Sequence, residues 1–300
     1  MNKVIVVQGP TASGKTELAI SLAKKYETEI ISADSRQFYK EMSIGTAKPS
    51  EYELNTVKHH FIDSVSIKEE ISSANYAKSV EPILFHLLNK TGFVVIVGGS
   101  GMFIDALIDG LDEVPVNSSI RKELTGLFNQ YGLEPLLTEL IERDPVFYEQ
   151  VDRNNPMRII RALEAIRSSG QKMSDFQKNQ KKERDFQVFR LSIDWPREIL
   201  YYRINRRVDD MISQGLIHEV LSLADFRHLN SLNTVGYKEI FEYLDGIITQ
   251  EKAIELVKQH TRNYAKRQLT WLRRYSNLKY LNPLSDLSIL DQAIQIIDTF

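Results

Sequence analysis

Near its start the chain contains the stretch Gly9-Pro10-Thr11-Ala12-Ser13-Gly14-Lys15-Thr16. This stretch fits the phosphate-binding pattern G-x-x-x-x-G-K-[ST] at every required position. An apolar run predicts a strand over residues 4–7, and apolar residues with helical spacing predict a helix over 17–25. Backbone N–H groups of such a loop surround phosphate oxygens, Lys15 adds a charge, and Thr16 adds a hydroxyl for Mg²⁺. The sequence therefore predicts a site for a diphosphate or triphosphate.

Two further apolar runs indicate strands of the same sheet. Residues 29–34 end in polar side chains, and residues 92–97 lead into Gly98-Gly99-Ser100-Gly101. Between these runs, residues 76–88 have the apolar spacing of a helix. Continuous apolar strands that alternate with helices are typical of a parallel sheet covered on both faces. We therefore predict an α/β fold with a P-loop-type parallel sheet, in which the polar residues after the strands meet at one edge.

The pattern changes in the second third of the chain. Residues 113–185 have helical periodicity without convincing strands, and their last part, 178–185, is highly charged and is expected to be exposed. Residues 186–193 then alternate like a strand, and the rest of the chain is mostly helical. We predict an inserted all-helical domain over 113–185 and an α/β core made of residues 1–112 and 186–300.

The composition is that of an ordinary soluble globular protein, with 42% hydrophobic and 26% charged residues. No stretch approaches the roughly 18 consecutive apolar residues of a membrane-spanning helix. The chain begins almost directly with the first strand and shows no targeting segment, so a cytoplasmic protein without membrane contact is expected. The absence of cysteine excludes disulfides, cysteine zinc sites and thiol nucleophiles.

The net charge of −2 conceals two basic segments. Residues 261–275 contain five Lys or Arg and no acid, and residues 153–172 contain five against one glutamate. Such segments are expected of a protein that binds a phosphate backbone, and a solvated helix face is the alternative explanation for each. Trp195 and Trp271 are interpreted as packing residues rather than as platforms for base stacking.

Asp34 follows the second predicted strand and is a candidate general base, which needs only hydrogen-bond reach to a weakly acidic proton. A helix-capping role is the alternative, because Asp34-Ser35 is also a good N-cap pair. The strand before Gly98 ends in glycine rather than in the second acid with which many P-loop proteins hold Mg²⁺. This absence favours a small phosphate-transfer or diphosphate-release enzyme over a motor or switch hydrolase.

Arg203 and Arg207 are four residues apart on a predicted helix and therefore share a face. Two guanidinium groups on one face suit a diphosphate or a phosphate backbone, and salt bridges to Asp209 or Asp210 are the alternative. The adjacent pair His59-His60 is not expected to share a metal ion, because neighbouring side chains on a strand point to opposite sides.

Further blocks of sequence carry a resemblance to one family. They are, in chain order, Ile31-Ser32-Ala33-Asp34-Ser35-Arg36-Gln37-Phe38-Tyr39, Ile44-Gly45-Thr46-Ala47-Lys48-Pro49, His59-His60 with Asp63, Gly98-Gly99-Ser100-Gly101-Met102-Phe103, Asn155-Pro156-Met157-Arg158-Ile159-Ile160-Arg161-Ala162-Leu163-Glu164, Val235-Gly236-Tyr237-Lys238-Glu239 and Tyr264-Ala265-Lys266-Arg267-Gln268-Leu269-Thr270-Trp271. Together with the P-loop, over roughly residues 4–275, the chain resembles the bacterial tRNA dimethylallyltransferases, also called tRNA isopentenyltransferases.

The resemblance implies a prenyltransferase. Such an enzyme moves the dimethylallyl group of dimethylallyl diphosphate to N6 of the adenosine on the 3′ side of the anticodon in tRNA, and diphosphate leaves. Asp34 is then the catalytic base that takes a proton from the amine. Lys15, Mg²⁺ on Thr16, and Arg203 or Arg207 would stabilise the charge of the leaving group. The loop from Gly9 to Thr16 would hold a diphosphate, although on its own it indicates an ATP or GTP site.

The resemblance also implies that the reacting base is flipped out of the RNA into the protein. The residues expected near the flipped adenine are Asp34, Ser35, Arg36, Gln37 and Ser100, and the amide of Gln37 suits the adenine edge. The residues expected to hold the RNA are Arg158 and Arg161 of the inserted domain, with Arg121 and Lys122 as weaker candidates for backbone contact, and Lys266 and Arg267 near the core. A monomer that binds one tRNA is the simplest expectation.

Three positions depart from the family pattern. Phe103 stands in place of a usual tyrosine, Lys238 in place of a usual arginine, and Arg36 in place of a common methionine. None of them removes a residue that the chemistry needs. The alternatives are a kinase that uses ATP, a relative that acts on free adenine nucleotides, and a non-catalytic RNA-binding module. The kinase explains neither the basic C-terminal segment nor the helical insertion.

Overall fold

The computed structural model describes residues 1–112, 114–177 and 181–299. The described chain forms two compact units, residues 1–108 with those from 183 onward, and Asp109–Lys182. The sequence predicted that the inserted domain begins at residue 113 and that the core resumes at residue 186. These positions are four and three residues later than the boundaries in the structure. Glu113 and residues 178–180 of the predicted charged segment lie outside the described part of the chain.

The larger unit is built on a six-stranded sheet in which every neighbouring pair is parallel. Its order is β3-β2-β4-β1-β5-β6, with bounds β1 Asn2–Gln8, β2 Ile30–Ser32, β3 His59–His60, β4 Phe93–Gly98, β5 Phe186–Ile193 and β6 Leu278–Leu281. The strands predicted over 4–7, 29–34, 92–97 and 186–193 are confirmed. The edge strand β6 was not predicted, because two of its four residues are exposed and its apolar run is short.

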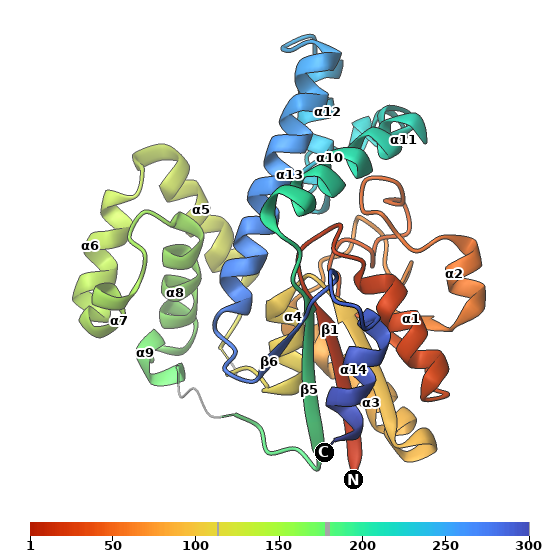
Figure 1. Cartoon of the computed structure of the whole chain (residues 1–300). Helices are drawn as coiled ribbons and strands as arrows, with labels where there is room; N and C mark the ends of the chain where they lie inside the picture. Colours follow the sequence, from red (N-terminus) through yellow and green to blue (C-terminus); the bar gives the residue numbers. More distant parts are fainter. Residues whose placement is uncertain (113, 178–180, 300) are drawn as a thin grey trace. The chain divides into compact units, whose positions relative to one another are not determined.

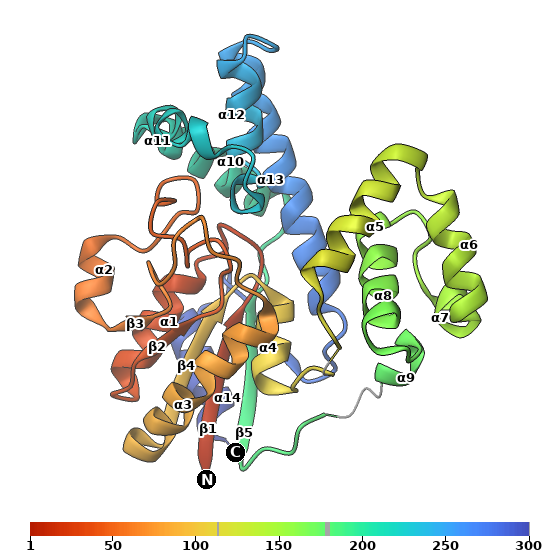
Figure 2. The ribbon, with the colours of Figure 1, turned by 180° about the vertical axis from the view of Figure 1, so that it is seen from behind.

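Helices cover both faces of the sheet, as the apolar strands require (Figures 1 and 2). Alternate residues of β1 point to opposite faces: Ile5 belongs to one buried cluster and Val6 to the other. The first face is covered by α1 (Lys15–Lys25) and α14 (Ile289–Asp298), and the second by α3 (Ser73–Thr91) and α4 (Gly101–Ile108). The parallel, doubly covered sheet of the prediction is therefore confirmed.

A group of helices lies beyond the carboxyl ends of the strands (Figure 1). It consists of α10 (Arg197–Ser213), α11 (Leu216–Ser222), α12 (Tyr237–Leu244) and α13 (Gln250–Leu272), with two short 3-10 turns at Ala224–Phe226 and Asn230–Leu232. Leu216, Tyr237 and Ile240 pack there against Tyr39 and Met42 from the segment after β2. The short helix α2 (Glu51–Thr56) belongs to the same long connection between β2 and β3. These helices therefore form walls at the edge of the sheet where ligands bind.

The smaller unit is helical wherever it is described, apart from its turns and linkers. Its helices are α5 (Ser118–Tyr131), α6 (Glu134–Arg143), α7 (Pro145–Gln150), α8 (Pro156–Ser169) and α9 (Met173–Phe176), around a core that includes Leu124, Leu140 and Leu163. Glu164 is fully buried and accepts hydrogen bonds from the Asn117 N–H at 2.7 Å and from Arg121 Nε at 3.0 Å. A separate apolar core and a paired buried charge make this unit compact by itself.

Among the described residues, no helix combines the length and the apolar character needed to cross a bilayer.

Candidate active site

The phosphate-binding loop, residues 9–16, connects β1 to α1 and has a positive φ at three residues. The angle φ is +156° at Gly9, +63° at Ala12 and +96° at Gly14, and the two glycines adopt such angles without a steric penalty from Cβ. Lys15 begins α1, and its Nζ donates to the Pro10 carbonyl at 2.7 Å. The ammonium therefore folds back over the loop at a helix N-terminus, where anions are stabilised.

Side chains from distant elements hold the backbone of this loop from outside. The three contacts are Trp195 Nε1 to the Ser13 carbonyl at 2.9 Å, Arg203 Nε to the Ala12 carbonyl at 2.8 Å, and the Thr11 N–H to Gln268 Oε1 at 2.9 Å. The Arg203 guanidinium also lies over the Trp195 ring, 4.7 Å from its centre. The loop is thus fixed in place by the protein itself, which reduces the cost of ordering it around a ligand.

The second arginine of α10 also points to the loop. Arg207 Nη1 donates to Thr11 Oγ1 and Nη2 to the Ala47 carbonyl, both at 3.3 Å. Asp209 was one of the two acids considered as salt-bridge partners of these arginines, and it pairs instead with Lys258 at 2.5 Å. The guanidinium of Arg207 is therefore directed into the site rather than into a surface ion pair.

The cations of the loop perturb one another. Burial lowers the pKa of Lys15 to about 8, the neighbouring Arg207 lowers it as well, and the Asp34 carboxylate opposes both effects. Burial likewise lowers the pKa of Arg207, and Asp34 again opposes the change. Both lowered pKa values mean that the charged forms are destabilised by their surroundings in the protein. A bound anion would favour the charged forms and raise both pKa values.

Asp34 lies at the carboxyl end of β2 in a turn rather than at the start of a helix. Its Oδ1 accepts from the Arg36 N–H at 3.1 Å. Ser100, from the glycine block after β4, accepts from the Ser35 N–H at 3.1 Å and lies 3.2 Å from the Ser35 hydroxyl. The structure thus brings Asp34, Ser35 and Ser100 together at adjacent strand ends.

The glycines of this block allow a close approach of backbones and side chains. A Cβ on Gly98 would lie 2.3 Å from the Ala33 carbonyl oxygen, and one on Gly99 would lie 2.1 Å from Gln268 Nε2. Gln268 Nε2 donates to the Gly99 carbonyl at 3.1 Å. The absence of side chains at Gly98 and Gly99 therefore lets the turn after β2 and helix α13 pack against the end of β4. Gln268 also accepts from the Thr11 N–H, so it links this contact to the P-loop.

Two cavities meet at the loop. The first, the loop cavity, has a volume of about 920 Å³. Its charged lining consists of the cations Lys15, Lys48, Arg203, Arg206 and Arg207 and the acids Glu17, Glu51, Glu53, Asp63 and Asp210, and the cations Lys15, Arg203 and Arg207 donate hydrogen bonds to the P-loop. The second, the aspartate cavity, has a volume of about 740 Å³ and is lined among others by Asp34, Ser35, Gln37, Tyr264 and Arg267. The residues common to both are Lys15, Thr16, Ala47, Pro49, Arg207 and Met211. An anion site and a carboxylate site therefore share one wall.

Arg36 and Gln37 line the aspartate cavity, and both have intramolecular partners. Gln37 Nε2 donates to the carbonyls of Thr46 and Ala47 at 3.2 and 3.1 Å, whereas Arg36 Nη1 donates to the Ser231 carbonyl at 2.8 Å. These contacts fix the walls of the cavity.

Helix α13 supplies a further wall. Tyr264 lines the aspartate cavity, and burial together with the charge of Asp34 raises the pKa of this tyrosine to about 12. Arg267 is exposed at the same cavity, with its guanidinium 5.6 Å from the centre of the Tyr264 ring. Lys266 is also exposed, and its Nζ lies 3.4 Å from Asn263 Oδ1. The two predicted RNA-binding cations of α13 are therefore accessible.

The predicted RNA contacts of the smaller unit fall into two kinds. Lys122 and Arg158 are exposed. Arg161 instead donates to the Pro115 carbonyl at 2.6 Å and to the buried Glu164 at 3.0 Å. Arg161 thus stabilises its own unit, and a role in RNA binding stays a prediction.

The described residues contain no cluster of three or more His, Cys, Asp or Glu able to hold a metal ion. Mg²⁺ does not require one, because it binds through one or two protein oxygens, substrate phosphates and water. Thr16 fits this donor set, since it lies in the first turn of α1 beside Lys15 and lines both cavities. His59 and His60 have separate partners, the Val57 carbonyl at 2.8 Å and Glu29 Oε2 at 2.7 Å.

Several residues of the site were not predicted from the sequence. Tyr264 and Gln268 lie in a block that had been singled out for its basic residues, and their spacing of four places them on one face of a helix. That spacing was the available signal. Trp195 was interpreted as a packing residue, and it both packs and holds the loop.

Comparison with known families decides the relationship. The family model described as IPP transferase matches residues 37–275. The chain belongs to the IPP transferase family. This IPP transferase is 44% identical over 284 residues to tRNA dimethylallyltransferase 2 of Parabacteroides distasonis, which covers 94% of this chain and 95% of the relative. It is 43% identical to tRNA dimethylallyltransferase 1 of Bacteroides thetaiotaomicron, with 97% and 95% of the two chains covered.

Solved structures of similar proteins support the same assignment. The tRNA isopentenylpyrophosphate transferase of Bacillus halodurans matches this IPP transferase with a TM-score of 0.72 and 35% identity, over 100% of this chain and 95% of the other. A eukaryotic dimethylallyltransferase described as acting on tRNA matches with a TM-score of 0.85 and 26% identity, over 100% and 79%.

Proposed function

We propose that this protein is a tRNA dimethylallyltransferase that uses dimethylallyl diphosphate and modifies N6 of the adenosine on the 3′ side of the anticodon. The observation that carries the proposal is the shared wall between the P-loop cavity, where Lys15, Arg203 and Arg207 gather at the loop, and a cavity that contains Asp34. A diphosphate in the first cavity and an adenine in the second can meet there. Membership of the IPP transferase family supports the same reaction.

The P-loop cavity receives the diphosphate end of the substrate. Lys15 and the N-terminus of α1 bind its oxygens, and Arg203 and Arg207 complete a cationic lining. As the C–O bond breaks, negative charge grows on the diphosphate, and preorganised cations stabilise that charge most in the transition state. The loop therefore serves a leaving group, with no nucleoside triphosphate consumed.

Thr16 is the residue proposed to bind Mg²⁺, through its hydroxyl. When bound, the ion neutralises part of the diphosphate charge.

Asp34 acts as the general base in this proposal. The exocyclic amine of adenine is a weak nucleophile, because its lone pair is delocalised into the ring. N6 attacks the allylic carbon, the bond from that carbon to the diphosphate oxygen breaks, and one proton of the amine passes to the carboxylate. Burial and the charge of Asp34 raise the pKa of Tyr264 to about 12, so the tyrosine hydroxyl stays protonated beside the base.

The adenine reaches Asp34 only after it leaves the RNA stack. Ser35, Arg36, Gln37 and Ser100 surround it in this proposal. Gln37 Nε2 is held by the Thr46 and Ala47 carbonyls, so its Oε1 is the atom that accepts from the adenine edge. Lys266 and Arg267, and in the smaller unit Lys122, Arg158 and Arg161, bind the RNA backbone. The protein acts as a monomer that binds one tRNA.

One experiment tests the proposed reaction. The protein is incubated with dimethylallyl diphosphate, Mg²⁺ and unmodified tRNA, and the digested RNA is examined by mass spectrometry. The expected result is the gain of one C5H8 unit on a single adenosine. Consumption of ATP in a parallel incubation, without this gain, would establish a kinase instead.

Removing the exposed cations of α13 is expected to weaken RNA binding in a salt-dependent way. The double variant Lys266→Ala with Arg267→Ala should lose tRNA affinity, and its plot of log affinity against log salt should be shallower by about one to two units. Filter binding over a salt series measures both effects. Lys252→Ala, on the same helix but in an exposed ion pair with Glu255, is the control. An unchanged slope in the double variant would exclude both cations from the RNA surface.

The lowered pKa of Lys15 predicts a pH effect on substrate capture. Because the free protein holds this ammonium with a pKa of about 8, the charge is present below that pH and is lost above it. The value of kcat/KM for dimethylallyl diphosphate should therefore fall as pH rises through 8. Lys15→Arg, whose guanidinium stays charged, should remove the fall even if its overall rate is lower. A wild-type profile that stays flat up to pH 9.5 would contradict the assignment.

A further inference from the structure

Residues 43–49, called here the partition loop, contribute Ala47 and Pro49 to the wall that the two cavities share. Parts of this loop line the loop cavity and parts line the aspartate cavity. Its Ala47 carbonyl accepts from Arg207 Nη2 at 3.3 Å and from Gln37 Nε2 at 3.1 Å. A single peptide group of the loop therefore orients one polar side chain of each cavity.

Glu219 of α11 holds the partition loop from one side. Its carboxylate accepts from three successive backbone N–H groups, those of Ser43 at 2.9 Å, Ile44 at 2.7 Å and Gly45 at 2.9 Å. The Tyr237 hydroxyl donates to the same carboxylate at 2.6 Å. Successive N–H groups that converge in this way form a concave anion site, and here the anion is a side chain of the protein.

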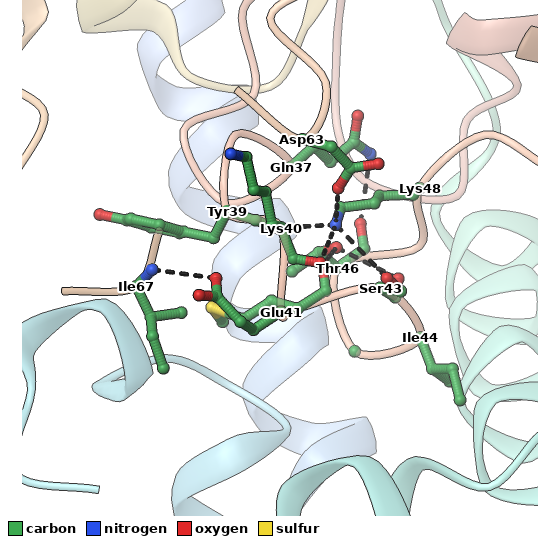
Figure 3. Close-up of polar contacts among 12 residues, drawn as sticks. Gln37, Tyr39, Lys40, Glu41, Ser43, Ile44, Thr46, Lys48, Asp63 and Ile67 are labelled. Carbon is green, nitrogen blue, oxygen red and sulfur yellow. Dashed lines mark hydrogen bonds and ion pairs between the residues drawn. The ribbon is translucent and has the colours of Figure 1, made fainter. Parts of the chain in front are cut away.

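Lys48 holds the partition loop from within (Figure 3). Its Nζ donates to the Tyr39 carbonyl at 2.6 Å and lies 3.3 Å from the Lys40 carbonyl and from Ser43 Oγ. The same ammonium forms an ion pair with Asp63, and its side chain is only 7% exposed. The lysine therefore fixes the turn of the loop, whereas Glu219 fixes its position against α11 and α12.

Tyr237 leaves little room for movement at this contact. A Cβ on Gly45 would lie 2.5 Å from Cε2 of the Tyr237 ring. Burial and the charge of Glu219 raise the pKa of Tyr237, so its hydroxyl stays protonated and remains a donor. Glu219, Tyr237 and Gly45 thus form one packed contact between the partition loop and the helices.

We propose that Glu219 is a positioning residue that fixes the partition loop and thereby aligns the two substrates with each other. The inference rests on the proposed function, because it assigns the diphosphate to one side of the loop and the adenine to the other. Glu219 touches neither reacting group. Its carboxylate acts through the Ala47 carbonyl, which orients Arg207 toward the diphosphate and Gln37 toward the base.

The test compares wild type, Glu219→Gln and Tyr237→Phe in steady-state kinetics with both substrates varied. In Glu219→Gln an amide NH₂ group takes the place of one acceptor oxygen and faces donors, so the loop must shift. The expected result is a rise of about tenfold in KM for tRNA and for dimethylallyl diphosphate together, with a fall in kcat of about tenfold. Tyr237→Phe keeps the carboxylate and the packing, and should show the same pattern at a few-fold size.

Glu198→Gln, an exposed residue on α10, is the matched control and should behave as wild type. Each variant is checked for its unfolding midpoint, so that rates refer to folded protein. A variant Glu219→Gln that changes only one KM, or that lowers the midpoint while its KM values stay unchanged, would overturn the inference. Failure of wild type to modify tRNA would instead contradict the proposed function, and the two failures are therefore distinguishable.

Discussion

Replacing Asp34 by asparagine should lower kcat by about 10³-fold, within the 10²- to 10⁴-fold range typical of a general base. The amide keeps the size of the side chain, and its oxygen can still accept from the Arg36 N–H, so the turn after β2 should persist. What is lost is the group that takes the proton from N6. Affinity for tRNA should change by less than about twofold, because contacts to the RNA backbone supply most of it.

Single-turnover rates with saturating tRNA, together with filter binding, separate these two effects. Asp286→Asn, at an exposed position outside both cavities, serves as the control for the change of charge. Equal losses in rate and in affinity would show that Asp34 positions the RNA and is not the base.

The second large effect is expected for Lys15→Met. Methionine fills a similar volume without the ammonium, so the developing charge of the diphosphate loses one preorganised donor, which costs about 10²- to 10³-fold in kcat. KM for dimethylallyl diphosphate should also rise, since the same ammonium binds the ground state. Binding of tRNA should be unaffected, because the Lys15 ammonium is folded back onto the Pro10 carbonyl of the P-loop.

Lys24→Met provides a matched control, because Lys24 is an exposed lysine in the last turn of the same helix. Product formation over a range of dimethylallyl diphosphate concentrations measures kcat and KM. A Lys15→Met protein with kcat within about twofold of wild type would remove Lys15 from the stabilisation of the leaving group.

The sequence predicted the centre of the sheet well and its edges poorly. The strand before the P-loop and the one beginning at Phe186 are long, apolar and buried, so hydrophobic runs reveal them. The edge strands β3 and β6 have two and four residues and are partly exposed. Their pairing depends on neighbours that are distant in sequence, which no local pattern contains.

The residues of the candidate site also divide into those that a local sequence pattern reveals and those that only the fold reveals. Gly14, Lys15 and Thr16 follow from local sequence, because a P-loop is a contiguous motif. The partners that hold the loop, such as Trp195 and Gln268, come from positions about 180 and 260 residues away. Their side chains also suit a core or a helix surface, so only the fold distinguishes these roles. Residue types thus indicated the chemistry, and tertiary contacts determined how it is supported.

The position of β1 in the middle of the sheet has a consequence for how the protein is made. On one side β1 pairs with β4, but on the other its Asn2 pairs with Phe186 of β5, which the ribosome delivers only after the whole helical unit. That unit has its own apolar core and can collapse first, while β1 keeps an unpaired edge that can pair wrongly with another nascent chain. The arginines of α10 and the glutamine of α13 arrive later still. A ribosome-bound chain therefore carries the P-loop sequence long before it has a phosphate site, and shielding by a chaperone is most valuable in that interval.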